Sequence, residues 1–396
     1  MGFIYSKAVS VIVVLEGVVW DIVKKASTSN TAKQLSPKEM EDLEQDDWIS
    51  RVWTYQEMVN NDNVYFTTFD PLDKQVVVPY EPLLNCIGYS SDRWTKETEV
   101  STAQFLLEFP NLNNLADTLV DARLSGYLGR SALGVLTNMA ARKFDHKYPG
   151  NRLLASLGAL TQKPSWSPAA TLFELAEKVM CTCEEVNDYS FIYTSDKRDE
   201  RSAFGWRPDP HQPKSNNHKP AHLVPVLNWP SHGEPMGNTQ RAHRDSKGLW
   251  IDNMIRLQLS KTIRPKVKEG LERWLYGQEK DPARPKESRS VGFWGSKEKG
   301  KSDLASALFE AFQVIGFTGS SKCQICENGL FFPVLDLEGQ KYVELFASSS
   351  IRWKFGAPGL AIWKEGDVTR YSAGLLAGDL GPTMAQALLG EPVLMI

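Results

Sequence analysis

Residues 9–15 read Val-Ser-Val-Ile-Val-Val-Leu, and five of these seven residues are β-branched. A continuous apolar run of this length predicts a β-strand that is buried on both faces, as in the interior of a parallel sheet. Only eight residues precede this run, so no earlier strand and helix of the chain can supply the neighbours that a covered strand needs. The run therefore predicts an α/β arrangement in the first part of the protein.

The residues that follow supply helices and a second strand. Residues 17–26 are amphipathic, and Ser36-Pro37-Lys38-Glu39 predicts a helix start with a capping box and a proline in the first turn. Residues 47–60 predict a third helix with one apolar face, formed by Trp48, Val52, Tyr55 and Val59. Residues 63–69 alternate and are rich in aromatic side chains, which predicts a strand.

The rest of the chain predicts a larger mixed α+β region. Residues 171–180 predict an amphipathic helix and residues 189–194 a strand, whereas residues 195–248 show little periodicity. A helix face formed by Leu304, Leu308, Phe312 and Ile315 follows, and then come short strands at 330–335, 342–346 and 359–363. We expect an α+β protein overall.

Four segments are expected along the chain. Residues 1–65 form the α/β part, and residues 66–195 are mainly helical with a few strands. Residues 196–303 form a basic, irregular segment with a helix, rich in proline and histidine, and residues 304–396 form a small α+β region.

Composition and charge exclude several classes of protein. The 396 residues are 42% hydrophobic and 23% charged, which is ordinary for a globular protein and excludes disordered, collagen-like and coiled-coil chains. The net charge is −3, although residues 196–303 hold 22 Lys and Arg against 14 Asp and Glu, a local excess of +8. We expect no nucleic-acid partner and no membrane partner, because the total charge is near neutral and the apolar run near the start is too short to span a bilayer.

The cysteines predict a reducing compartment. Five cysteines are too few, and odd in number, for a disulfide framework, so we expect a cytoplasmic protein. Cys323 and Cys326 have the spacing of half a zinc site, but Cys181 and Cys183 do not have the spacing of the other half. We expect ordinary thiols and no bound metal.

Residues 295–302 read Gly-Ser-Lys-Glu-Lys-Gly-Lys-Ser, which formally matches a phosphate-binding loop before a helix. In such a loop backbone amides hold a phosphate while Lys301 and Ser302 would contact the phosphate and magnesium. The preceding strand would be short, and the central residues are large and charged rather than small. Nucleotide binding at this loop is an alternative function, and a basic surface loop is the simpler interpretation.

The most specific local sequence is Trp-Ile-Ser-Arg-Val-Trp-Thr-Tyr-Gln-Glu at residues 48–57. Two tryptophans, an arginine and a Gln-Glu end are more polar than a core helix requires. A carboxylate one turn beyond an aromatic ring can hold a ribose hydroxyl or act as a base, with the ring as a wall. The alternative is an aromatic core face whose Glu57 pairs with an arginine.

At these residues the chain resembles the fungal heterokaryon-incompatibility (HET) domain family. The family signature W-x-x-R-x-W-x-x-Q-E is matched by Trp48, Arg51, Trp53, Gln56 and Glu57. Its I-Y-x-x-A segment before a hydrophobic strand is similar to residues 4–8, which read Ile-Tyr-Ser-Lys-Ala. An arginine followed by a P-x-D/N-R-x-x-A-x-L-G stretch is resembled by Arg142 and residues 149–158.

The resemblance implies a fold, an activity and a partial domain. HET domains are similar to TIR domains, whose flavodoxin-like fold supports NAD cleavage by a glutamate four residues after a tryptophan. By this resemblance Glu57 is the catalytic candidate, and Trp53 and Arg51 are the candidates for binding NAD, which would be a substrate; no cofactor is expected. The Y-x-W-G and D-x-x-C-I-x-Q motifs that open the family's domain have no counterpart in the chain, so we expect a TIR-like half-domain.

The function that the resemblance implies is fungal non-self recognition leading to programmed cell death. Cleavage of NAD could be retained or lost, because the loops that hold the nucleotide would belong to the missing motifs. The alternative is a non-catalytic interaction module, in which the half-domain binds protein partners or a second copy of itself through an exposed strand edge.

Overall fold

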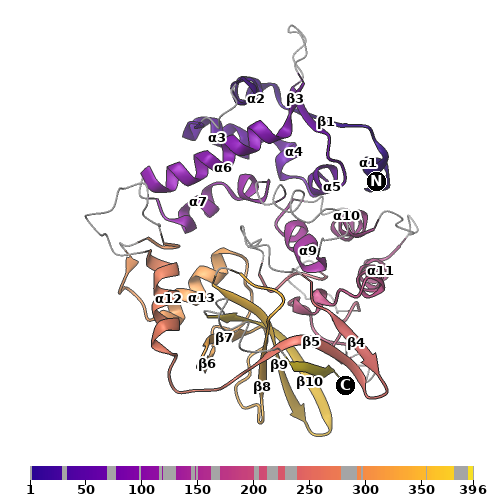
Figure 1. Cartoon of the computed structure of the whole chain (residues 1–396), viewed down its shortest axis with the longest axis vertical. Coiled ribbons are helices and arrows are strands. Elements are labelled where there is room, and N and C mark those ends of the chain that lie inside the picture. Colours follow the sequence, from indigo (N-terminus) through magenta and orange to yellow (C-terminus); the bar gives the residue numbers. More distant parts are fainter. Residues whose placement is uncertain are drawn as a thin grey trace. The chain divides into compact units, whose positions relative to one another are not determined.

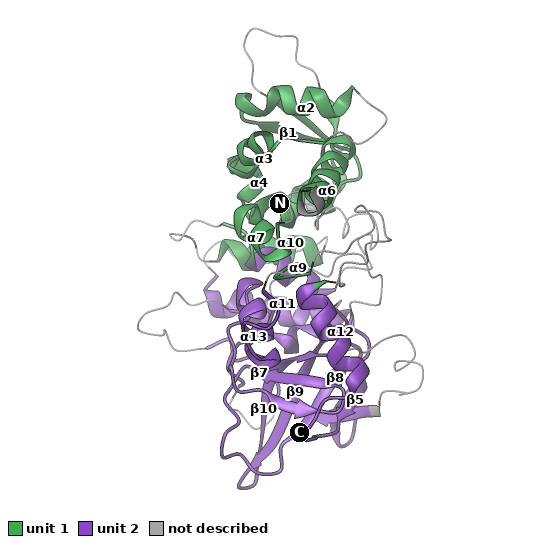
Figure 2. Cartoon of the chain, turned by 90° about the vertical axis from the view of Figure 1, so that its left-hand side faces the viewer, with its two compact units in different colours: residues 1–129, 141–165, 277–297 green, residues 130–140, 166–276, 298–396 purple. Residues whose placement is uncertain are grey.

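The computed structural model describes most of the chain, and these residues form two compact units (Figure 2). Unit 1 comprises residues 1–129, 141–165 and 277–297, and unit 2 comprises residues 130–140, 166–276 and 298–396. The described residues are 2–28, 34–68, 77–97, 100–115, 118, 131–143, 148, 150–161, 170–199, 205–211, 222–227, 239–277, 292–295, 298–353, 355–378 and 391–395.

Unit 1 contains a three-stranded sheet in the order β1 (Val11–Leu15), β2 (Val64–Thr68), β3 (Val78–Pro79). Strands β1 and β2 pair in parallel, from Val11 opposite Val64 to Leu15 opposite Thr68, and β3 pairs antiparallel to β2. The predicted β1 and β2 are thus confirmed. The expectation that β1 is buried on both faces is wrong, because its side chains alternate and Ile12 and Val14 remain 57% and 55% exposed.

Helices cover the other face of this sheet. The buried side chains of β1 and β2 join one apolar core with residues from α2 (Trp20–Ser27), α3 (Pro37–Glu44) and α6 (Tyr80–Glu97). Figure 1 shows these three helices on one side of β1. The core also receives α7 (Thr102–Glu108), while α1 (Gly2–Lys7) precedes β1 and η1 (Gly17–Val19) follows it.

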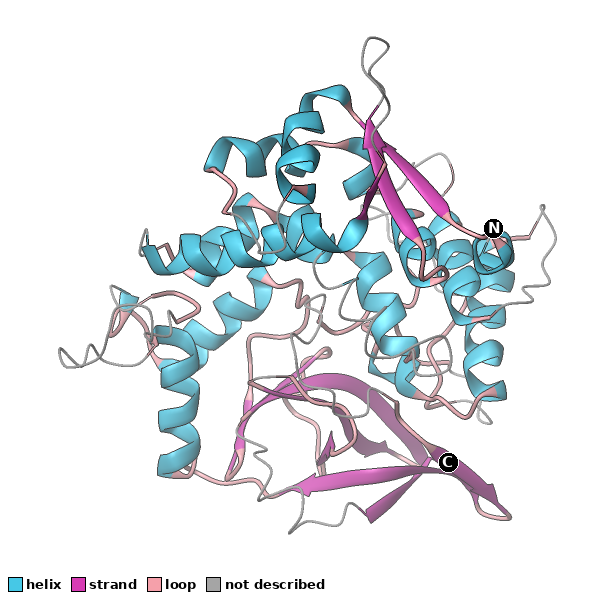
Figure 3. Cartoon of the chain, turned by 45° about the horizontal axis from the view of Figure 1, so that its top comes forward, coloured by secondary structure: helices cyan, strands magenta, loops and turns pink. Residues whose placement is uncertain are grey.

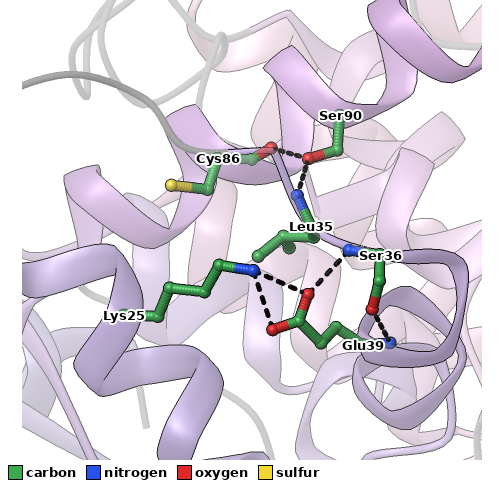
Figure 4. A network of polar contacts seen from close by, with 6 residues as sticks. All are labelled: Lys25, Leu35, Ser36, Glu39, Cys86 and Ser90. Carbon is green, nitrogen blue, oxygen red and sulfur yellow. Dashed lines mark hydrogen bonds and ion pairs between the residues drawn. The ribbon is translucent and has the colours of Figure 1, made fainter.

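The helix start predicted at Ser36 is confirmed in detail (Figure 4). The hydroxyl of Ser36 accepts a hydrogen bond from the Glu39 amide, and a carboxylate oxygen of Glu39 accepts one from the Ser36 amide at 2.6 Å. Lys25 of α2 forms an ion pair with Glu39 at 2.8 Å, and the Ser90 hydroxyl of α6 accepts the Leu35 amide. One local motif therefore connects α2, α3 and α6.

Unit 2 is built on an antiparallel sheet whose strands follow the order β11-β5-β8-β9-β10-β7-β6, with β4 paired to β5. Figure 3 draws the strands in magenta. The strands are β4 (Ala242–Asp245), β5 (Gly248–Leu257), β6 (Gln324–Cys326), β7 (Gly329–Pro333), β8 (Glu344–Ser348), β9 (Gly356–Glu365), β10 (Val368–Ala377) and β11 (Glu391–Met395). Its helices are α9 (Ala132–Ala140), α11 (Leu172–Glu185), α12 (Pro265–Tyr276) and α13 (Leu304–Val314).

Several expectations for unit 2 are confirmed and others are wrong. The helices at 171–180 and from Leu304, and the strands near 330, 344 and 359, are present. The strand expected at 189–194 is instead the 3-10 helix η2 (Ser190–Tyr193). Its neighbour Asp188 accepts hydrogen bonds from the amides of Ser190 and Ala132, which fixes a turn at this point.

The fold class is α+β, as expected, but the division into four consecutive segments is not the division into compact units. Each unit is made of three separate stretches of chain. The irregular segment at 196–303 contributes β4, β5 and α12 to unit 2, and residues 277–297 to unit 1. The likeness of unit 1 to a TIR or flavodoxin half-domain remains a prediction.

Candidate functional site

The segment with the two tryptophans lies in unit 1 and forms two short helices. These are α4 (Asp47–Ser50) and α5 (Thr54–Val59), so the single helix expected over residues 47–60 is wrong. Trp48, Val52, Tyr55 and Val59 are nevertheless all buried, as the apolar face predicted. Asp46 fixes the start of α4, because one carboxylate oxygen accepts the Trp48 amide at 2.9 Å and the other accepts the Glu16 amide at 2.9 Å.

The break between α4 and α5 is caused by a contact from a distant segment. Arg51 has an extended backbone and forms a parallel bridge with Lys143. The Lys143 amide donates to the Ser50 carbonyl at 2.9 Å, and the Val52 amide donates to the Lys143 carbonyl at 3.0 Å. These bonds use backbone groups that would otherwise continue the helix.

The carboxylate of Glu57 joins three elements of unit 1. One oxygen accepts a hydrogen bond from the indole nitrogen of Trp48 at 2.6 Å, and the other accepts one from the Tyr5 hydroxyl at 3.2 Å. Trp48 is buried and its ring packs edge-on against Phe66 of β2, with centroids 5.4 Å apart. We call Tyr5, Trp48 and Glu57 the Glu57 cluster.

The charge of Glu57 affects the acidity of Tyr5. Burial of Tyr5 and the neighbouring negative charge of Glu57 together raise the pKa of the Tyr5 hydroxyl to about 12, and the positive charge of Arg51 opposes this shift. Both effects favour the protonated phenol, which can then donate its hydrogen bond to the carboxylate. The cluster therefore contains a neutral tyrosine as donor at physiological pH.

The three residues expected to form the site are only partly brought together. Arg51 is exposed and lies close enough to Tyr5 to influence its pKa, and Trp53 is half-buried at the start of α5. The contacts found for the Glu57 carboxylate join it to Trp48 and Tyr5. Trp48 and Tyr5 both lie in the matched motifs, so the sequence pointed to these positions. The motifs did not, however, indicate that either side chain binds Glu57.

A second contact joins the signature to α10 (Asn151–Leu160). The side-chain amide of Gln56 donates to the Ala155 carbonyl at 2.6 Å and to the Leu154 carbonyl at 3.3 Å. Gly158 makes room for this contact, since a Cβ at this position would lie 2.2 Å from the Gln56 amide nitrogen. Asn60 adds a hydrogen bond to the Gly158 carbonyl at 2.9 Å.

Arg142 makes a third contact between matched segments. Arg142 is only 3% exposed. Its guanidinium donates a hydrogen bond to the Ile49 carbonyl at 3.0 Å. It also donates to the Asn114 carbonyl at 3.2 Å and to the Thr118 hydroxyl at 2.6 Å. A buried arginine that binds backbone carbonyls of separate segments fixes their relative positions.

The geometry of the Glu57 cluster limits the chemistry available to it. An ionised carboxylate has about four lone-pair sites, and Tyr5 and Trp48 occupy one on each oxygen. Such a carboxylate can still accept a ribose hydroxyl or stabilise a positive charge. To act as a base toward a substrate it would use a remaining lone pair or exchange one of its two partners.

The loop at residues 295–302 is stabilised by contacts of its own. Ser296 and Lys297 lie outside the described residues. Lys301 forms an ion pair with Glu298 at 2.7 Å, and α13 begins only at Leu304. The Asp303 carboxylate accepts the amides of Ala305 and Ser306 at 3.0 and 3.1 Å, where a phosphate would otherwise be held. These contacts favour the surface-loop interpretation, and nucleotide binding remains an untested alternative.

The cysteines carry free thiols, three of them buried. Burial raises the pKa of Cys326 to about 12, which makes its thiolate unfavourable as a metal ligand or nucleophile. Within the part of the chain that the structure describes, histidine, cysteine and acidic side chains form no group of three that could bind a metal ion.

None of the helices in the described ranges combines the length and hydropathy that a bilayer crossing requires. Comparison of the chain with models of known protein families, with curated proteins and with solved structures found no match.

Proposed function

We propose that this chain is a HET-type protein that acts in fungal non-self recognition leading to programmed cell death, and that it works in the cytoplasm. The observation that carries the proposal is the convergence of the three motif segments quoted for the resemblance. Tyr5 contacts Glu57, Gln56 contacts Ala155, and Arg142 contacts Ile49, although these pairs lie 52, 99 and 93 residues apart.

Convergence of this kind supports a common origin of the motifs. Matches that arose by chance in a long chain would have no reason to pack against one another. Here the most specific residues of each match make the contacts: the glutamine and glutamate of the signature, the tyrosine of the first segment, and the glycine that admits Gln56 to α10. The free thiols of all five cysteines are consistent with a reducing compartment.

Two roles are open to Glu57 within this function. The first is structural, in which Glu57 positions α1 and α4 on α5, because each of its carboxylate oxygens already accepts a hydrogen bond from the protein. NAD cleavage is the second candidate. Its support is the half-buried position of Glu57 and the positive charge of Arg51, which acts on the same Tyr5 hydroxyl and could attract a phosphate-containing substrate.

Expression in a filamentous fungus tests the proposal. Inducible expression of the full chain is expected to arrest growth and admit a vital dye, and absence of arrest would refute the proposed function. Cellular NAD is measured in the same cultures by liquid chromatography. Arrest with normal NAD supports recognition without catalysis, whereas NAD loss that Glu57→Gln abolishes supports the enzyme.

The matched control is Glu269→Gln, the same substitution at an exposed position of α12 in unit 2. It is expected to behave as the wild type in both measurements. Thermal unfolding of purified Glu57→Gln separates loss of the fold from loss of chemistry.

A further inference from the structure

Arg51 and Lys143 lie side by side in unit 1, although they come from distant parts of the chain. They form a parallel β-bridge, which the Lys143 amide and carbonyl hold through hydrogen bonds to Ser50 and Val52. Paired residues of neighbouring strands direct their side chains to the same side. Val52 and Arg142, their neighbours in sequence, are buried, whereas Arg51 and Lys143 are exposed. Both side chains therefore leave the bridge on its solvent side, and we call them the cation pair.

The cation pair places two positive charges together without an acidic partner. Like charges that lie directly opposite each other on neighbouring strands are destabilising. Across the ranges that the structure describes, neither Arg51 nor Lys143 forms an ion pair, whereas Lys25 and Lys38 of the same unit do. A bound anion would remove the repulsion between the two charges. The arrangement therefore indicates an anionic ligand.

Two acidic side chains lie near the cation pair, and their carboxylates are already engaged. Burial raises the pKa of Glu44 to about 7 although the charge of Lys143 opposes this shift, so Glu44 is about half protonated at neutral pH. Its two oxygens accept the amides of Asn111 and Leu112, both at 2.9 Å. Glu57 accepts hydrogen bonds from the other two members of the Glu57 cluster. The charges of the cation pair thus remain available to a ligand.

The cation pair lies close to the Glu57 cluster. Burial and Glu57 raise the pKa of the Tyr5 hydroxyl, and the charge of Arg51 opposes them, so Arg51 acts on the group that binds Glu57. Cations bind phosphate oxygens, and a carboxylate with unused lone pairs accepts sugar hydroxyls. These are the two kinds of group that recognise a ribose joined to a phosphate.

We propose that the cation pair binds the diphosphate of a dinucleotide, with Lys143 as a binding residue outside the signature. Arginine presents a planar fork and lysine a compact charge, so each can hold one of the two phosphates. The adjoining ribose would then reach the unused lone pairs of Glu57. The inference rests on NAD cleavage, the second candidate within the proposed function, and names the residues that hold the charged part of the substrate.

Titration calorimetry of the purified full chain with ADP-ribose tests the proposal. ADP-ribose keeps the diphosphate of NAD and lacks the bond to nicotinamide, so cleavage of that bond cannot consume it. Loss of one exposed ion pair weakens binding about fivefold, which is the effect expected of Lys143→Gln and of Arg51→Gln. The double variant is expected to weaken binding about 25-fold, since the two losses multiply. Lys143→Arg keeps the charge and is expected to retain most of the affinity.

The matched control is Lys24→Gln, the same substitution at an exposed lysine of α2, which is expected to bind as the wild type does. Two smaller probes identify the parts of the ligand that are recognised. Adenosine, which lacks phosphate, is expected to bind at least about tenfold more weakly than ADP-ribose. Inorganic pyrophosphate, which lacks ribose, is expected to bind more weakly than ADP-ribose and to show the same loss in Lys143→Gln.

Four outcomes would overturn the proposal. The first two are a wild type that binds no ADP-ribose at about 1 mM and a double variant that binds it as tightly as the wild type. The third is an equal loss in Lys24→Gln, which would reveal unspecific attraction, and the fourth is pyrophosphate binding as tight as that of ADP-ribose. Growth arrest is measured separately in the fungus, so failure of the cation pair and failure of the proposed function are distinguishable.

Discussion

The contact between Gln56 and α10 can be tested by adding a single methyl group. Gly158→Ala places a Cβ 2.2 Å from the Gln56 amide nitrogen and 2.6 Å from its amide carbon. These distances are far below van der Waals contact, so the Gln56 side chain must leave its place. Gln56 is 1% exposed, and its amide would lose the hydrogen bond to the Ala155 carbonyl.

The expected cost combines three effects. Overpacking of a closed core site costs about 1 to 3 kcal/mol, and the lost buried hydrogen bond about 1 kcal/mol. Alanine in the interior of a helix regains about 1 kcal/mol over glycine. We therefore expect Gly158→Ala to lower the free energy of unfolding of unit 1 by about 1 to 3 kcal/mol, which corresponds to about 5 °C in Tm for a unit of this size.

Thermal and urea unfolding of the full chain, followed by circular dichroism and tryptophan fluorescence, measure the effect. The matched control is Gly88→Ala in α6, where an added Cβ meets nothing within 4 Å. This control is expected to be neutral or to stabilise by up to about 1 kcal/mol. Because two units can unfold separately, only the unfolding transition of unit 1, which contains both Gly88 and Gly158, is compared.

The double variant Gln56→Ala with Gly158→Ala completes the test. Once Gln56 is truncated, the alanine at position 158 has room, so the two effects should not add, and their coupling should be at least about 1 kcal/mol. If Gly158→Ala proved as harmless as Gly88→Ala, the packing of the signature against α10 would be wrong, and the convergence that supports the proposed function would lose one of its three contacts.

Three further predictions concern unit 1. Glu57→Gln removes the negative charge beside Tyr5, so the pKa of Tyr5 should fall below about 12, as followed by a carbon-13 NMR titration of labelled tyrosine in the variant and in the wild type; an unchanged pKa would contradict the contact. Burial raises the pKa of Glu44 from 4.5 to about 7, so its protonated form contributes stability that is complete below about pH 4.5 and is lost as the pH rises through 7. As much as about 3 kcal/mol is involved, and Glu44→Gln should flatten the dependence of Tm on pH over this range. Ser36→Ala removes the capping box and should cost about 1 kcal/mol, whereas Ser36→Asp should keep most of the stability in the same unfolding experiment.

Features that depend on neighbours in the chain were predictable. The capping box at Ser36 needs only four consecutive residues, and the strand character of β1 and β2 follows from runs of β-branched and aromatic side chains. The alternating exposure of β1 was not predictable, because a run of valines is equally apolar on both faces. Whether other elements pack on a given face of β1 is decided by parts of the chain that are distant in sequence.

The internal structure of the candidate site was less accessible. Trp48 and Tyr55 were placed correctly on a buried face, but the break at Arg51 comes from Lys143, which the local pattern cannot reveal. Glu57 was singled out through a family resemblance, whereas its partner Tyr5 comes from a segment 52 residues earlier. The strand expected at 189–194 failed for a similar reason, because Asp188 binds the amide of Ala132 and fixes a turn.

Unit 1 is assembled from three separate stretches of the chain, and this affects how it folds during synthesis. The Ala103 amide donates to the Phe293 carbonyl at 2.9 Å, a contact that spans 190 residues, and residues 277–297 belong to the same unit. At about 5 to 20 residues per second, the ribosome delivers Phe293 about 10 to 40 seconds after Ala103. During that interval the strands and helices of unit 1 that are made first lack residues 277–297, and most of unit 2 is synthesised before these residues appear. Such a nascent chain is a natural client for chaperones, and slowing translation between residues 166 and 276 should lower the yield of folded protein.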